Sequence, residues 1–100
     1  MTPLYHSVYF WLNDAADAPR LANGCRAYLS AIPGIVRMNV GAPAGTLGAP
    51  VDNSYSVALL IEFESKEACA VYDSHPDHLR FIAEFGPLLS RVQVYDAVSA

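Results

Sequence analysis

The chain has 100 residues, of which 53% are hydrophobic and only 16% are charged. Ten acidic and six basic side chains give a formal net charge of −4 at pH 7. High hydrophobicity with low charge excludes an intrinsically disordered chain, and the length predicts a single domain over residues 1–100. Nucleic acid and membranes are not expected partners, because the basic residues are scattered singly and the longest apolar stretch is far too short to span a bilayer.

The two cysteines, Cys25 and Cys69, fall in segments with helical patterns. They can form one bridge at most, whereas a disulfide framework needs several. We therefore expect two reduced, buried thiols, as is usual for free cysteines in a reducing compartment. The N-terminal residues lack the basic region and the small-residue cleavage site of a signal peptide, and we expect a cytoplasmic location.

Residues 5–12 are rich in aromatic and β-branched side chains, which predicts a strand. Alternation places His6, Val8, Phe10 and Leu12 on one face and Tyr5, Ser7, Tyr9 and Trp11 on the other. A helix is expected to begin near Pro19, which suits a first turn, and to end at Pro33 and Gly34. Its apolar stripe consists of Leu21, Cys25, Tyr28, Leu29 and Ile32.

Two further strands are predicted at residues 35–41 and 55–63, separated by a loop rich in glycine and proline over residues 42–53. Ser65 is a suitable N-cap for a helix that begins at Lys66. Pro76 interrupts this helix and can restart it as a first-turn residue, and Gly86 with Pro87 ends it. Residues 91–98 form the last predicted strand.

This order, β-α-β-β-α-β, predicts an α+β, ferredoxin-like fold with one four-stranded antiparallel sheet and both helices on one face. The other face of the sheet is left without cover. It carries Tyr9, Trp11, Leu60 and Tyr95. Monomers rarely expose such a patch, and aromatic residues are enriched in interface cores. We therefore expect a homodimer that pairs through these sheet residues.

The segment from Tyr72 to His78 holds two of the three histidines of the chain. The spacing of His75 and His78 can bring two imidazoles to a metal ion, but a zinc site needs at least a third ligand, and His6 is the only obvious one. His75 can instead act as an N-cap ahead of Pro76, pointing away from His78. We expect no metal and no other cofactor.

Metal-free acid–base chemistry is the alternative. Because Pro76 redirects the chain between Tyr72 and His78, both side chains can face one cavity, where histidine can take a proton and tyrosine can donate to a developing oxyanion. The competing interpretation is that both residues are structural and simply cover the core.

Several segments together carry a family resemblance. They are HSVYF from His6, IPGI from Ile32, the strand that opens at Tyr55 and runs into FES at Phe63, YxxHPxH from Tyr72, and VxVYD from Val92. In this order they resemble the stress-responsive dimeric α/β-barrel (Dabb) family over nearly the whole chain. The resemblance implies a ferredoxin-like protomer and a homodimer whose two sheets close a barrel.

The resemblance also implies a site. A plant polyketide cyclase of the family performs an aldol condensation without metal, using a tyrosine and a histidine that match Tyr72 and His78. By this comparison Tyr72 and His78 are the catalytic candidates, and a small apolar or aromatic, polyketide-like ligand is the expected partner. The predicted pocket residues are His6, Val8, Phe10, Leu59, Ile61, His75, Phe81 and Ile82. A pocket histidine of that cyclase is replaced here by Val57, so the substrate is not carried over.

Two other functions stay open from the sequence. One is a non-catalytic stress-responsive or ligand-binding dimer with a vestigial site. The other is a cofactor-free monooxygenase of the related dimeric α/β-barrel type, for which Trp11 and Asn39 are available, although no spacing favours them.

Overall fold

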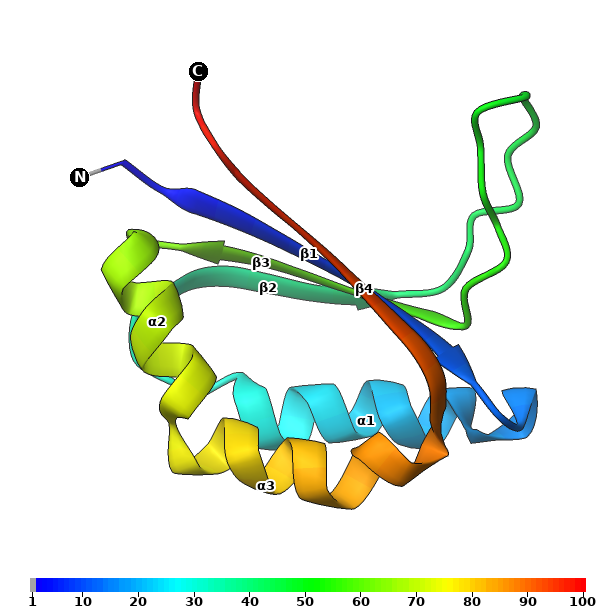
Figure 1. Cartoon of the computed structure of the whole chain (residues 1–100), viewed down its shortest axis with the longest axis horizontal. Helices are drawn as coiled ribbons and strands as arrows, with labels where there is room; N and C mark the ends of the chain where they lie inside the picture. The colour runs from blue at the N-terminus through cyan, green and yellow to red at the C-terminus, as the bar shows by residue number, and fades with distance from the viewer. Residues whose placement is uncertain (1) are drawn as a thin grey trace.

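The computed structural model describes residues 2–100 and contains one four-stranded sheet with the helices on one of its faces (Figure 1). The strands are β1 (Leu4–Leu12), β2 (Ile35–Gly41), β3 (Val57–Phe63) and β4 (Leu89–Val98). The helices are α1 (Ala18–Leu29), α2 (Lys66–Ser74) and α3 (Pro76–Phe85), with 3-10 turns η1 (Ala15–Asp17) and η2 (Gly86–Leu88). No helix among these residues is long and apolar enough to cross a membrane.

The strand order is β2-β3-β1-β4, and all three neighbouring pairs are antiparallel. This confirms the predicted ferredoxin-like α+β fold. Strand β1 lies inside the sheet, where His6 is opposite Ile61 on β3 and opposite Asp96 on β4. The register of the two terminal strands therefore brings an acidic side chain next to a buried histidine.

The core lies between the sheet and the helices. Strand β1 alternates as predicted, with His6, Val8 and Phe10 buried on the helix side and Tyr5 exposed on the other. Burying an aliphatic or aromatic side chain stabilises the fold by about 1.5–3 kcal/mol each. Cys25 and Cys69 are both free and buried within this layer, as expected.

Three element boundaries differ from the sequence-based expectation. Helix α1 ends at Leu29, although Ile32 is still buried beyond it. Strand β3 begins at Val57, because Tyr55 leaves the ladder and packs edge-on against Tyr9. Strand β4 begins earlier, at Leu89, which pairs with the end of β1 across a register shift.

Helices α1 and α3 cross at a glycine. A Cβ atom built on Gly24 would lie 2.2 Å from the Phe85 ring, so only a residue without a side chain allows this approach. The close contact holds α3 beneath the sheet (Figure 1). That position determines which α3 side chains can reach the space next to β1 and β4.

Candidate active site

A cavity of about 560 Å³ lies between the helix-facing side of β1 and β4 and the helices α2 and α3. Its walls are mostly apolar and come from six elements, β1, β3, β4, α2, α3 and η2. The lining residues are His6, Val8, Phe10, Leu59, Tyr72, Asp73, His78, Phe81, Ile82, Gly86, Leu89, Ser90, Arg91, Val92 and Val94. The volume is in the range of small-molecule sites, about 300–1,000 Å³, which also share this mix of apolar walls and few polar groups.

The cavity contains most of the side chains that the sequence placed in a pocket. Those that line it are Tyr72, His78, His6, Val8, Phe10, Leu59, Phe81 and Ile82. The other two lie elsewhere: Ile61 is buried in the core, and His75 caps α3. Trp11 and Asn39 do not line the cavity either, since each borders a different surface depression.

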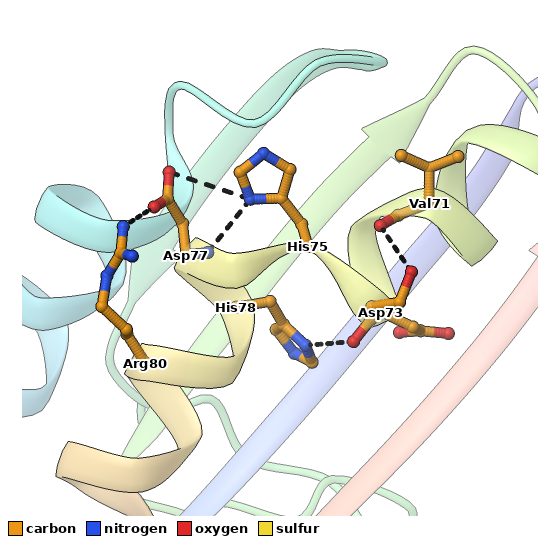
Figure 2. A network of polar contacts seen from close by, with 7 residues as sticks. Val71, Asp73, His75, Asp77, His78 and Arg80 are labelled. Atoms are coloured by element: carbon orange, nitrogen blue, oxygen red, sulfur yellow. Dashed lines mark hydrogen bonds and ion pairs between the residues drawn. The ribbon is translucent and has the colours of Figure 1, made fainter.

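The two histidines of the YxxHPxH segment have different roles (Figure 2). His75 ends α2 and caps α3, where its Nδ1 atom accepts a hydrogen bond from the Asp77 backbone N–H at 3.0 Å. The carboxylate of Asp77 lies 3.8 Å from the same nitrogen and also contacts Arg80. His75 is therefore a capping residue, while His78 turns to the cavity.

The hydrogen bond of His78 determines its tautomer. Its Nδ1 atom lies 3.0 Å from the backbone oxygen of Asp73 (Figure 2). A carbonyl oxygen can only accept, so Nδ1 carries the proton and the neutral ring keeps a lone pair on Nε2. Among the described residues no group bonds to Nε2. His78 is thus held as a hydrogen-bond acceptor and potential base at the cavity wall.

Tyr72 is the most buried polar side chain of the site, with only 1% of its surface exposed. Its ring packs against Phe63 at 4.9 Å, His6 at 5.8 Å and His78 at 4.5 Å between ring centroids. Burial is the main reason why the pKa of its phenol lies well above the usual value, with Cys25 and Asp73 adding to the shift. The phenol therefore stays protonated at neutral pH and can donate a hydrogen bond into the cavity.

His6 has a partner that sequence reasoning missed. Its Nδ1 atom lies 2.5 Å from the Oδ1 atom of Asp96, and His6 is 8% exposed. The carboxylate fixes the orientation of the ring beside Tyr72, leaving Nε2 for other contacts. The two residues are 90 positions apart, so only the register of β1 against β4 could have revealed the pair.

One group of side chains in residues 2–100 has potential metal-ligand geometry. Ligand atoms of His6, Cys69 and Asp96 all lie within 4.8 Å of one another. However, His6 Nδ1 and Asp96 Oδ1 are hydrogen-bonded to each other at 2.5 Å. Two ligand atoms of a tetrahedral zinc ion lie farther apart than this. Burial, together with Asp73 and Asp96, also raises the pKa of the Cys69 thiol to about 11, which disfavours the thiolate that binds metals. This arrangement fits an oriented histidine better than a metal ligand set.

Strand β4 forms the open wall of the cavity, which the sequence did not indicate. Val92 and Val94 line the cavity and are 46% and 40% exposed. Alternation along β4 puts them on the helix-facing side together with Asp96, at the edge of the sheet. Because these two cavity-lining valines are exposed, the cavity is open to solvent along an apolar edge.

Three solved structures illustrate what the fold resembles. A crystal structure of a Dabb family protein from Mesorhizobium loti has a TM-score of 0.82 and 24% identity, covering 100% of this chain and 99% of that chain. A dimeric ferredoxin-like protein of unknown function from Thermobifida fusca has a TM-score of 0.79 and 22% identity, covering 98% and 92%. Hydroxynitrile lyase from Passiflora edulis has a TM-score of 0.80 and 15% identity, covering 98% and 94%. At these identities the similarity shows the fold alone.

No curated protein matches the sequence. The family model described as the stress responsive A/B barrel domain, Dabb, matches residues 4–99. That match includes all four strands, the three helices and every residue of the cavity. The chain therefore belongs to the stress-responsive A/B barrel domain (Dabb) family.

Proposed function

We propose that this protein binds a small carbonyl compound in the cavity and acts on it with His78 as the base and Tyr72 as the oxyanion donor, without a metal ion. The observation that carries the proposal is the fixed tautomer of His78, whose Nδ1 donates to the Asp73 carbonyl at 3.0 Å beside the phenol of Tyr72. A base with a free lone pair and a protonated phenol then face the same apolar space.

The chemistry is that of a lyase or cyclase. The Nε2 atom of His78 takes a proton from the carbon next to a ligand carbonyl, while the Tyr72 hydroxyl donates a hydrogen bond to the oxygen where negative charge develops. The resulting enolate attacks a second carbonyl carbon and forms a carbon–carbon bond. The imidazolium returns its proton to the new alkoxide, so both side chains end in their starting states.

The walls of the cavity favour an apolar or aromatic ligand. Val8, Phe10 and Phe81 offer aliphatic and aromatic surface, and the Phe10 and Phe81 rings meet edge to face at 6.3 Å. A flat ketone with an aromatic ring, of the size of a short polyketide, matches such walls and places its oxygen next to the polar pair. Burial of the apolar part of the ligand would provide most of the affinity.

We also propose that the protein is a homodimer that pairs through the sheet face opposite the helices. Leu60 and Tyr95 on that face are 41% and 61% exposed, and Tyr9 and Trp11 lie next to them. The similar structure from Thermobifida fusca is described as dimeric, which supports a homodimer. The free thiols of the chain fit a reducing cytoplasm, which we propose as its location.

A ligand-binding protein without catalysis is the second candidate. The open, largely apolar wall formed by Val92 and Val94 favours it, because bound substrate would stay accessible to water. The fold of the Passiflora edulis hydroxynitrile lyase supports the lyase candidate, although by fold analogy only. Binding and turnover must therefore be measured separately.

Binding is tested by calorimetric titration with 4-hydroxyacetophenone as a probe. We expect Tyr72→Phe and His78→Ala each to raise the Kd by about 2- to 10-fold, the loss expected for one hydrogen bond. His75→Asn is the matched control, because it changes the neighbouring histidine of the same motif but keeps an acceptor for the α3 cap. An equal loss of affinity in all three variants, or none in any, would contradict the assignment of the cavity.

A further inference from the structure

The loop between β2 and β3 forms an arm, defined here as residues 42–56, that leaves the body of the protein. Figure 1 shows it extending from the sheet on the side opposite the helices. Residues 44–54 are all exposed, and the side chain of Leu47 is 96% exposed. Loops of this length without regular structure are uncommon in compact domains and usually have a function.

Hydrogen bonds within the arm hold its shape. The Asn53 side chain connects its two halves, accepting from the Gly45 N–H at 3.2 Å and donating to the Thr46 carbonyl at 3.0 Å. A turn closes between Gly48 and Val51, where the Val51 N–H donates to the Gly48 carbonyl at 3.0 Å. The arm therefore has a defined shape that does not depend on packing against its own protomer.

The base of the arm is continuous with the sheet face that we propose to pair. The Trp11 indole N–H donates to the Ser54 hydroxyl at 3.0 Å, and Tyr55 packs against Tyr9 at 5.0 Å between ring centroids. A depression of about 320 Å³ lies there between the arm and the face. It is lined by Tyr9, Trp11, Asp52, Tyr55, Arg91, Gln93 and Tyr95.

We propose that the arm clasps the second copy of this chain, with Leu47 as the apolar anchor. The inference rests on the proposed homodimer and adds the element that holds it. A copy seated on the exposed sheet face would lie alongside the arm, because the arm rises from the edge of that face and on the same side (Figure 1). Two-fold symmetry then gives each dimer two arms. The partner would cover the Leu47 side chain of each arm, which is otherwise exposed to water.

The test measures the dimer dissociation constant by sedimentation velocity over a dilution series of the full chain. We expect Leu47→Asp to raise this constant about tenfold or more, since it would place a charge in an apolar contact. Val71→Asp is the matched control, as it makes the same kind of change at a valine that is 55% exposed on α2, on the helix side of the molecule. We expect the control to change the constant less than twofold.

A second variant addresses the shape of the arm. Asn53→Ala removes the two side-chain hydrogen bonds that connect the halves of the arm but keeps Leu47. We expect it to weaken the dimer by a smaller factor than Leu47→Asp. If wild type dimerises and Leu47→Asp behaves like Val71→Asp, the arm proposal is wrong while the homodimer stands. If wild type is a monomer at micromolar concentration, the homodimer itself is wrong. Neither outcome of the dimer experiment affects the calorimetric test of ligand binding in the cavity.

Discussion

A single hydrogen bond or burial determines the tautomer, orientation or protonation of each polar side chain in the cavity. His78 receives its tautomer from the Asp73 carbonyl, and His6 receives its orientation from Asp96. Burial keeps the phenol of Tyr72 protonated. Acid–base catalysis needs groups held in a defined orientation, which the hydrogen bonds give to the two histidines, and a proton donor, which burial preserves in the phenol of Tyr72.

The buried thiols lead to a prediction about alkaline stability. Burial raises the pKa of Cys25 from about 9.0 to about 12 and that of Cys69 to about 11. Between pH 9 and 12 the folded chain therefore binds more protons than the unfolded chain, so the free energy of unfolding falls as the pH rises through this window. Each thiol contributes at most about 1.4 kcal/mol per pH unit to this slope.

Urea unfolding at pH 8 and at pH 10.5 measures the effect. Cys25→Ala should lower stability at pH 8, because it leaves a cavity in the core, but it should flatten the fall toward pH 10.5 relative to wild type. Comparing the two slopes removes the contribution of alkaline groups that do not interact with Cys25, whereas loss of Cys25 also lessens the rise in the pKa of Tyr72 and so adds to the flattening. Identical slopes would mean that Cys25 is not buried as the structure shows.

At the scale of elements, the break between α2 and α3 organises the site. Pro76 ends one helix and begins the next, which turns His78 toward the cavity and leaves His75 as a cap (Figure 2). We predict that His75→Ala destabilises the protein by about 0.5–2 kcal/mol, the usual cost of losing an N-cap, whereas His75→Asn has a much smaller effect. Urea unfolding at neutral pH compares the two, and equal losses would show that the cap is not the role of His75.

Much of this could be predicted from the sequence because the signals are local. Alternation along β1, the Ser65 cap and the proline between Tyr72 and His78 all act within a few residues, and the structure has each of them. The partnership of His6 with Asp96 could not be predicted, since it depends on the pairing of the two ends of the chain. His75 was expected either to cap the helix or to line the pocket, and in the structure it caps α3 and does not line the cavity.

At the scale of the whole molecule, the sheet separates the two proposed functional surfaces. The cavity lies on the helix side of β1 and β4, while the aromatic residues line the opposite face. The arm also extends on the side away from the helices (Figure 1). Each protomer therefore carries a complete set of proposed catalytic groups. Weakening the dimer through Leu47 should consequently leave the chemistry of the cavity unchanged.

The most direct test of the proposed acid–base pair is proton exchange at carbon. The wild-type protein, incubated with 4-hydroxyacetophenone in D2O, should accelerate deuterium incorporation into the acetyl methyl group, followed by proton NMR. His78→Ala should abolish the acceleration and Tyr72→Phe should reduce it by about 10- to 100-fold, while His75→Asn retains it. Probe binding without exchange in the wild type, or exchange that survives His78→Ala, would contradict catalysis by this pair; binding without exchange would leave the ligand-binding candidate in its place.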